Sequence, residues 1–338
     1  MKLLRYILFP IVPIYYLVTW LRNKFYDLGW EPSKSYDIPV VCVGNLSTGG
    51  TGKTPTIEYL IRLLENQYRV ATLSRGYKRE TSGFIIANEH ATARTIGDEP
   101  FQFYKKFKKA IVAVDADRQN GISELIKLNQ SDVILLDDAF QHRKVKASFD
   151  ILLTAYGNLY TDDIVLPTGN LREPRAGAKR ADIIIVTKCP RNLSSSEKDQ
   201  IRKKLKPLTY QSVYFSAISY SDKVLSESSS RPVKQFVEKK VTLVTGIANP
   251  NPLVAYLKSE SIDFEHLKFN DHHVFSTSEI ETLKQKEVIL TTEKDYMRLQ
   301  DSFKFNPSQL WYLPISFEID VKGDFDNQIL TLISSISN

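Results

Sequence analysis

Cysteine is scarce in this chain, and internal repeats and low-complexity tracts are absent. Two of the 338 residues are cysteine, Cys42 and Cys189, and they lie far apart in apolar, strand-like runs. This excludes a disulfide framework or a cysteine metal site, and indicates small core residues in a reducing compartment. With 42% hydrophobic and 25% charged residues, the chain is expected to bury a globular core.

A hydrophobic run long enough to cross a membrane is also missing from the N-terminal region. Residues 6–21, YILFPIVPIYYLVTWL, carry no charge, but a spanning helix needs roughly 20 apolar residues and Pro10 and Pro13 would break this one. No cleavage site of a signal peptide follows. The aromatic residues and the basic residues that flank the run, Lys2 among them, predict a helix that lies in the membrane interface. A buried core helix is the alternative.

The positive charge of the chain is modest and scattered. The formal net charge is +6, which favours anionic partners such as nucleotides or phospholipid headgroups. The basic residues do not form the dense patch, interleaved with aromatic residues, that nucleic-acid binding requires. We therefore expect no nucleic-acid partner, and the sequence indicates no obligate protein partner.

Residues 44–54, GNLSTGGTGKT, are typical of a phosphate-binding loop. The pattern G-x-x-x-x-G-K-[ST] has Ser47 where a glycine is usual, but the stretch follows a predicted strand and precedes a predicted helix, as the motif requires. Backbone N–H groups and the helix N-terminus would hold phosphates, with Lys53 at the β- and γ-phosphates and Thr54 on Mg²⁺. A glycine-rich turn without ligand is the alternative. The residues predicted to bind the nucleotide are Ser47, Thr48, Gly49, Gly50, Thr51, Gly52, Lys53 and Thr54.

A second signal is the stretch 131–142, SDVILLDDAFQH. An acid after a buried strand is how P-loop enzymes supply a carboxylate to their metal ion. Asp137 and Asp138 are adjacent, so only one of them can point fully along the strand toward Mg²⁺. An Asp-rich turn after a core strand is the alternative.

The order of apolar runs predicts an α/β fold of the P-loop NTPase type, with a doubly wound, mostly parallel sheet. The buried strands are expected at 38–44, 69–73, 110–114, 132–136, 149–154 and 182–187, with helices at 53–66 and 118–129. The polar, Ser-rich stretch 221–240 indicates a linker or hairpin, after which a helix at 276–286 and strands at 287–292 and 310–315 are expected. We predict a membrane-associating segment at 1–30, a P-loop domain at 31–225 and a smaller α/β domain at 226–338.

Several further motifs have no function when each is read alone. GDEP at 97–100 is typical of a turn, and DHH at 271–273 of a surface loop. SRGYKR at 74–79 and LPTGNLREPRAGAKR at 166–180 place cations after strands, where they could clamp phosphates or only solvate loops. The residues alone therefore predict a P-loop enzyme with a membrane-facing N-terminus, and leave the acceptor open.

Nine motifs occur along the chain in the order VGNLSTGGTGKTP, SRGYKR, GDEP, DADR, LLDDAFQH, LPTGNLREP, GIANP, DHHVF and TTEKD. As an ordered set they resemble the tetraacyldisaccharide 4′-kinase family, the lipid A 4′-kinases of Gram-negative bacteria. The resemblance runs from the N-terminal hydrophobic segment to about residue 299. The phosphate-binding loop of that family has the pattern GN-x-[ST]-x-GG-x-GKTP, and Ser47 fits this pattern. The resemblance implies transfer of the γ-phosphate of ATP, with Mg²⁺, to the 4′-hydroxyl of a tetraacylated glucosamine disaccharide 1-phosphate. The product would be lipid IVA, made at the cytoplasmic face of the inner membrane by a peripheral or monotopic enzyme.

The resemblance also implies roles for residues at the matching positions. Asp98 of GDEP would be the base that activates the acceptor, and His272 of DHH would partner it from the smaller domain, while Lys53 would handle phosphates. Thr54, Asp137 and Asp138 would hold or orient the metal. The positions expected to line the acceptor or transition-state region are Arg75, Tyr77, Glu99, Arg118, His142 and Arg172. TTEKD has no assigned role.

Two other functions fit parts of the sequence. A soluble P-loop kinase or NTPase that acts on a small metabolite would need the N-terminal run to be core. A membrane-associated ATP-binding switch would leave GDEP and DHH without a role.

Overall fold

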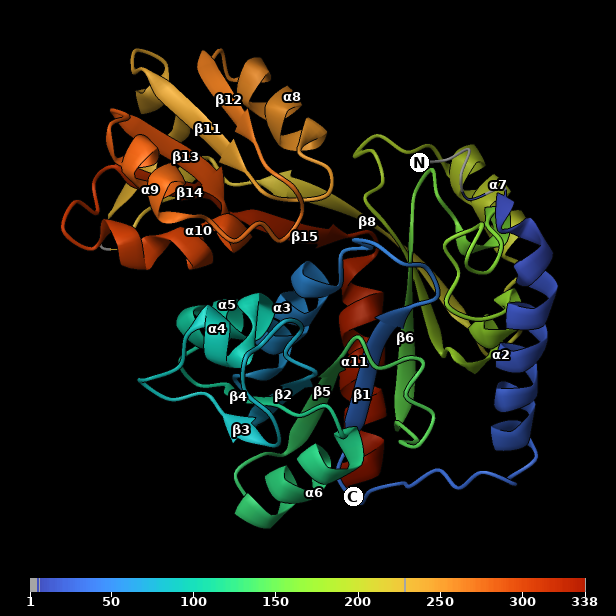
Figure 1. The fold of residues 1–338 in the computed structure, drawn as a ribbon. Coiled ribbons are helices and arrows are strands. Elements are labelled where there is room, and N and C mark those ends of the chain that lie inside the picture. Colours follow the sequence, from blue (N-terminus) through green and yellow to red (C-terminus); the bar gives the residue numbers. More distant parts are fainter. Residues whose placement is uncertain (1–4, 6, 228, 338) are drawn as a thin grey trace.

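The strands of the chain form two sheets of different size (Figure 1). The computed structural model describes residues 5, 7–227 and 229–337. Within them the larger sheet has nine strands, in the order β15-β8-β7-β6-β1-β5-β2-β4-β3. Their bounds are β1 Val40–Asn45, β2 Val70–Ser74, β3 Ile85–Ile86, β4 Ile111–Val114, β5 Val133–Asp137, β6 Phe149–Ala155, β7 Ile183–Thr187, β8 Ser212–Tyr220 and β15 Ile315–Ile319.

The predicted doubly wound, mostly parallel sheet is confirmed. Of the pairs in the larger sheet, β3–β4 and β15–β8 are antiparallel and the others parallel. We call this sheet and the helices around it the first lobe. Its helices are η1 Phe9–Ile11, α2 Val12–Asp27, α3 Lys53–Leu64, α4 Ala93–Ile96, α5 Asp98–Lys106, α6 Arg118–Leu128, η2 Tyr160–Asp162, η3 Arg175–Arg180, α7 Ser195–Leu205 and α11 Lys322–Ser337.

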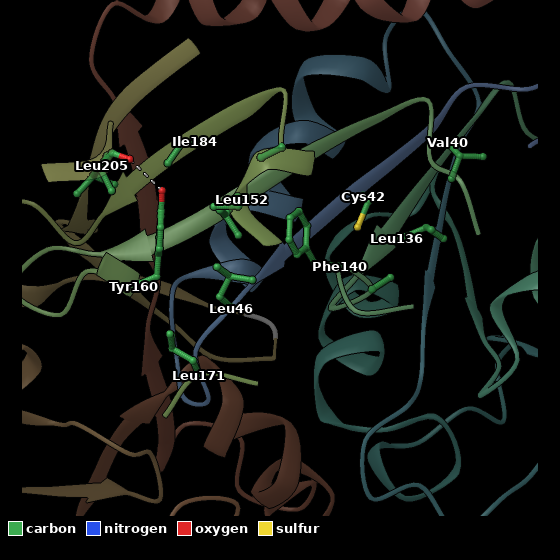
Figure 2. Packing of buried hydrophobic residues seen from close by; sticks show 14 of the residues in the cluster. Val40, Cys42, Leu46, Leu136, Phe140, Leu152, Tyr160, Leu171, Ile184 and Leu205 are labelled. Atoms are coloured by element: carbon green, nitrogen blue, oxygen red, sulfur yellow. Dashed lines mark hydrogen bonds between the residues drawn. The ribbon is translucent and has the colours of Figure 1, made fainter. Parts of the chain in front are cut away.

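Successive residues of the central strands pack into separate cores on the two faces of the sheet, which explains their continuous hydrophobicity. Val41 packs with α3 and α11 on one face. Cys42 packs on the other face with α6 and α7. Figure 2 shows this second core around Phe140 and Leu152. Both cysteines are buried and free, as expected.

The smaller sheet forms the second lobe, in the order β10-β9-β14-β13-β11-β12. Its strands are β9 Lys223–Leu225, β10 Ser230–Pro232, β11 Val241–Thr245, β12 Phe264–Lys268, β13 Val288–Thr292 and β14 Leu310–Leu313. Its helices are η4 Val233–Phe236, α8 Asn251–Ser259, α9 Thr277–Lys284, α10 Glu293–Leu299 and η5 Gln300–Phe303.

The C-terminal part of the chain returns to the first lobe. The single strand expected at 310–315 is wrong, because Pro314 separates β14 of the second sheet from β15 of the first. β15 pairs with β8, where the Ser219 and Ser316 hydroxyls are 2.6 Å apart, and α11 covers the larger sheet. The domain boundaries at 30/31 and 225/226 stay a prediction; the topology adds that residues 315–337 lie with the first lobe.

The N-terminal helix α2 lies along the outside of the first lobe (Figure 1). Pro10 and Pro13 stand at the starts of η1 and α2, where a missing N–H needs no helical partner. Asn23 is the buried residue of α2, whereas Ile14 is 64% and Val18 59% exposed, so α2 is not the buried core helix considered as the alternative. Lys2 and the first residue of the uncharged run lie outside the described residues. In the part of the chain that is described, no helix has both the length and the apolar character of a membrane span.

Candidate active site

The loop between β1 and α3 has the backbone of a phosphate-binding loop. Gly49 and Gly52 have φ angles of 106° and 88°, which other residues rarely adopt, and Gly52 is the N-cap of α3. The N–H of Thr48 donates to the carbonyl of Asn170 (2.7 Å), and Ser47 forms a β-bridge with Leu171. The first half of the loop is thus held by the segment 166–172, which leaves the second half for a ligand.

Two side chains at the end of β7 hold the outer side of this loop. The Thr187 hydroxyl donates to the carbonyl of Thr51 (2.7 Å), and the Lys188 ammonium donates to the carbonyl of Gly50 (2.5 Å). These carbonyls are therefore engaged by the protein. Burial, together with the nearby Lys294 and Lys53, lowers the pKa of Lys188. Several cations thus converge around the loop, as suits an anionic ligand.

Lys53 and the paired aspartates lie together at the carboxyl edge of the sheet. The Lys53 ammonium is 3.3 Å from Asn45 Oδ1 and 3.5 Å from Asp138 Oδ1. Arg172 Nη1 donates to the same Asp138 oxygen (2.8 Å). Burial acts to raise the pKa of Asp138, but Lys53 and Arg172 outweigh it and hold that pKa below its ordinary value.

Asp137 has a different environment from its neighbour. Its carboxylate is buried at the end of β5, and Oδ1 has no hydrogen-bond partner among the described residues. Burial, followed by the nearby Glu99 carboxylate, raises the pKa of Asp137 to about 7. A buried carboxylate with a free oxygen and a carboxylate neighbour is a place where a cation would be stabilised.

Glu99, expected near the acceptor, lies beside the phosphate-binding loop. The Thr54 hydroxyl donates to Glu99 Oε1 (3.2 Å), and Lys294 of the second lobe forms an ion pair with the same oxygen. Burial acts to raise the pKa of Glu99, but Lys294 and Lys53 lower it below its ordinary value.

Thr54, Asp137 and Asp138 fit a magnesium ion in the chemistry of their donors. Mg²⁺ usually takes one or two carboxylates and completes its shell with substrate phosphates and water. The described residues contain no cluster of three or more His, Cys, Asp or Glu side chains placed to bind a metal. The free Oδ1 of Asp137 is the observation that favours a cation here.

Asp98 and His272 meet across the two lobes, although 174 positions separate them in the sequence. Asp98 is the first residue of α5, and its Oδ2 is 3.1 Å from Nδ1 of His272. The His272 backbone has a φ of 57°. The ring of Tyr77 packs edge-on against the imidazole, with 5.4 Å between the ring centroids. Burial acts to raise the pKa of Asp98, but hydrogen bonds from His272 and Arg298 lower it below its ordinary value.

Three of the expected acceptor residues form a group beside the aspartates. Arg118 is buried, with Nη1 donating to the carbonyl of Asp115 (2.8 Å) and Nε without a partner among the described residues. His142 Nε2 is buried and likewise lacks a partner there, and burial followed by Arg118 lowers the pKa of His142. Arg75 is exposed and lies near enough to Arg118 for its charge to act on it. Buried polar atoms without a protein partner favour a water or a polar ligand at this place.

Sequence reasoning missed three residues of the site, namely Lys188, Lys294 and Arg298. Lys294 and Arg298 both lie on α10, four positions apart and therefore on one face of the helix. Thr292 caps that helix by accepting from the N–H of Asp295 (3.2 Å). The TTEKD motif followed by a basic residue one turn later was a signal that could have found two of them.

Comparison with known proteins agrees with this geometry. A family model described as "Tetraacyldisaccharide-1-P 4'-kinase" matches residues 4–334. A tetraacyldisaccharide 4′-kinase of Flavobacterium johnsoniae is 53% identical over 338 residues, covering 98% of each chain. One of Bacteroides thetaiotaomicron is 43% identical, covering 92% of this chain and 88% of its own.

A solved structure is similar over nearly its whole length. It is the "apo" form of LpxK from Aquifex aeolicus in complex with ATP, with a TM-score of 0.79, 29% identity, and 98% of this chain and 99% of that chain covered. The phosphate-binding loop, the aspartates at the neighbouring strand end and the Asp–His pair between the lobes thus lie in a chain that is similar to named 4′-kinases over most of its length. The chain belongs to the tetraacyldisaccharide 4′-kinase family.

Proposed function

We propose that the protein transfers the γ-phosphate of ATP to the 4′-hydroxyl of a tetraacylated glucosamine disaccharide 1-phosphate and so forms lipid IVA. The observation that carries the proposal is the meeting of the phosphate-binding loop with the Asp98–His272 pair where the two lobes touch. The loop and its lysine can hold the donor, and the pair can hold the acceptor hydroxyl.

The donor half of the site rests on charge and backbone geometry. Phosphoryl transfer depends chiefly on positioning and on neutralising charge. The second half of the loop, Lys53 and the N-terminus of α3 would bind the β- and γ-phosphates. Mg²⁺, held by Thr54 with Asp137 or Asp138, would supply positive charge to the phosphate oxygens when bound.

The acceptor half of the site requires a base. A sugar hydroxyl has a high pKa, so a carboxylate takes its proton only as the bond to phosphorus forms. Asp98 would accept that proton, and His272 would orient the carboxylate and share the charge. The lowered pKa of Asp98 keeps it ionised, which is the form that a base needs.

The disaccharide headgroup would lie against the cluster of Arg75, Arg118 and His142. The guanidinium groups of Arg75 and Arg118 can donate to sugar hydroxyls or phosphate oxygens, and the imidazole of His142 can donate or accept according to its tautomer. Arg172, which holds Asp138, would help to orient charge at the transferred phosphate.

The lipid part of the substrate would stay in the bilayer, so the enzyme must work at a membrane surface. Each buried CH₂ of an acyl chain is worth about 0.8 kcal/mol, which makes withdrawal of four chains unfavourable. The exposed apolar side chains of α2 favour a peripheral enzyme at the inner-membrane surface, on its cytoplasmic face where ATP is available.

A transfer assay with purified lipid disaccharide 1-phosphate and γ-labelled ATP tests the proposal. We expect label on the lipid with the wild type, and a fall of about 10³-fold or more with Lys53→Ala and with Asp98→Ala. A wild type that leaves the lipid unlabelled would overturn the assignment. Label on a water-soluble sugar alone would favour a soluble kinase, and ATP binding without any transfer would favour a switch.

A further inference from the structure

We propose that Arg298 is a positioning residue, which reaches from the second lobe to hold the base Asp98 in its working orientation. The inference rests on the proposed function, because it assigns a task to a residue around the proposed base. It also gives a role to the motifs GIANP and TTEKD, which the reaction as described so far does not use.

The contacts on Asp98 are concentrated on one of its two oxygens. Arg298 donates to Oδ2 from Nε (2.8 Å) and from Nη2 (2.5 Å), and His272 Nδ1 lies 3.1 Å from the same atom. Within the described residues, Oδ1 of Asp98 receives no hydrogen bond. Oδ2 is therefore held by hydrogen bonds, whereas Oδ1 is available to the hydroxyl of the acceptor.

Arg298 is itself fixed on its far side. Its Nη1 donates to Asp295 Oδ1 (2.8 Å) and to the carbonyl of Gly246 (3.3 Å). Asp295 is fully buried, and its Oδ2 accepts from the N–H of Gly246 (2.9 Å) and from the Thr292 hydroxyl (2.7 Å). A guanidinium with partners on both sides cannot swing away from Asp98 without breaking several hydrogen bonds.

Gly246 joins the arginine to the histidine of the pair. Its carbonyl also accepts from the N–H of His272 (3.1 Å), so both partners of Asp98 are placed from one backbone residue. A Cβ at position 246 would lie 2.9 Å from Asp295 Oδ1. The glycine of GIANP is thus needed where Asp295 of TTEKD approaches the backbone.

Arg298 also lies close to the second partner of Asp98, His272. Its Nη2 lies 3.1 Å from Nδ1, the same separation as that between Nδ1 and Asp98 Oδ2. Arginine only donates and a carboxylate only accepts, so Nδ1 satisfies Arg298 when bare and Asp98 when protonated. The two contacts from Arg298 to Oδ2 are therefore the ones that do not depend on the tautomer of His272.

A double-mutant cycle on the full-length protein tests the proposal. The variants are Arg298→Gln, Asp98→Asn and the pair, with single-turnover transfer of label from γ-labelled ATP to the lipid as the measurement. We expect Arg298→Gln to lower the transfer rate about 100-fold. In the Asp98→Asn background the same change should lower the residual rate no further, because the arginine acts through the carboxylate.

Further measurements separate positioning from other roles. Arg298→Lys should recover part of the lost rate but not all, since an ammonium cannot make the paired contact. KM for ATP should stay within about twofold of the wild type. Arg191→Gln is the matched control, because Arg191 pairs with Glu318 at an exposed site and should leave the rate unchanged.

Each remaining outcome decides against the inference. Additive losses in the double variant would show that Arg298 acts independently of Asp98, and a large rise in KM for ATP would show that it contacts the nucleotide instead. A loss of folded protein in Arg298→Gln that Arg298→Lys shares in full would show a structural role only. Transfer by the wild type together with an unchanged Arg298→Gln would overturn this inference alone, whereas no transfer by the wild type would overturn the proposed function.

Discussion

Gly44 is the residue of β1 that lets the loop after the aspartates pack against the P-loop strand. A Cβ there would lie 2.6 Å from Cβ of Phe140 and 3.0 Å from its backbone nitrogen. Phe140 follows Asp138 by two positions and belongs to the core of that face (Figure 2). The absence of a side chain at residue 44 thus fixes the distance between the two halves of the phosphate site.

We predict that Gly44→Ala lowers the free energy of unfolding by about 1–3 kcal/mol, because backbone must shift to relieve the overlap. Chemical denaturation of the purified variant measures this. Gly323→Ala in α11 is the control, since a Cβ there meets no atom within 4 Å, and it should leave stability unchanged or raise it by up to about 1 kcal/mol. Equal stability of the two variants would contradict the packing described.

Residue spacing could indicate the phosphate loop but not the pairing of Asp98 with His272. The loop is local, because its glycines, lysine and threonine are consecutive. The pair joins residues 174 positions apart, and nothing in either motif states which distant group completes it. For Asp98, His272 and the acceptor residues the sequence supplied candidates through a family resemblance, and their roles stay predictions. Sequence reasoning missed Arg298 because no physical role was assigned to the TTEKD motif that precedes it.

At the scale of the element, α2 combines an exposed apolar surface with a fixed attachment to the site. Its Asn23 donates to the buried Glu173, and the Tyr15 hydroxyl donates to the carbonyl of Arg172 (2.9 Å). Arg172 in turn holds Asp138. The helix that would meet the membrane is thus bonded directly to a loop of the active site.

We predict that the triple change Ile14→Ser, Leu17→Ser and Val18→Ser weakens binding to anionic vesicles by at least about tenfold. The three side chains are 52–64% exposed, and burial of each in lipid would contribute about 1.5–3 kcal/mol. Vesicle sedimentation measures the binding. The melting temperature should not fall, because these exposed side chains contribute little to the core. A large fall would show that they pack on protein.

Six strands and two helices of the first lobe could be predicted from the sequence within two residues. β8, α5 and α7 were not predicted, and GDEP, expected to be a turn when read alone, begins α5. The partner of a strand could not be predicted either. Buried parallel strands are continuous apolar runs, so their positions are visible. The run at 310–315 shows the limit, since both sides of Pro314 are apolar and periodicity does not say which sheet each joins. That assignment depends on β8 and on the cover provided by α11, which are tertiary contacts.

At the scale of the whole molecule, a buried ionic group joins the lobes behind the active site. Lys106 at the end of α5 pairs with Glu58 of α3 (2.7 Å) and with Glu293 of α10 (2.8 Å). Burial, followed by Glu58, raises the pKa of Glu293 to about 7 despite the lysine. Since α5 begins with Asp98 and α10 carries Arg298, this group fixes the two helices that meet at the proposed base.

We predict that Glu293 makes the protein lose stability as the pH rises from about 4.3 to about 7. An unfolded glutamate releases its proton near pH 4.3, while the folded one retains it to about 7, so the folded state binds more protons in this window and its advantage shrinks as the pH rises. The contribution is at most about 4 kcal/mol. Thermal unfolding across this pH range should show a smaller decline for Glu293→Gln.

Glu281→Gln is the control for this pH dependence. Glu281 is 61% exposed in a pair with Lys284, so the wild-type decline should persist in it. A decline that is equally steep in Glu293→Gln would show that another group is responsible.

The return of the chain to the first lobe has a consequence for its synthesis on the ribosome. Phe325, Ile329 and Ile333 of α11 are fully buried against the larger sheet, yet they are translated after the whole second lobe. After the phosphate loop has emerged from the ribosome, one face of the larger sheet therefore stays partly uncovered until α11 is translated. Ribosome stalling or early termination near residue 315 would release a chain that carries every proposed catalytic group and lacks the cover that holds them in register.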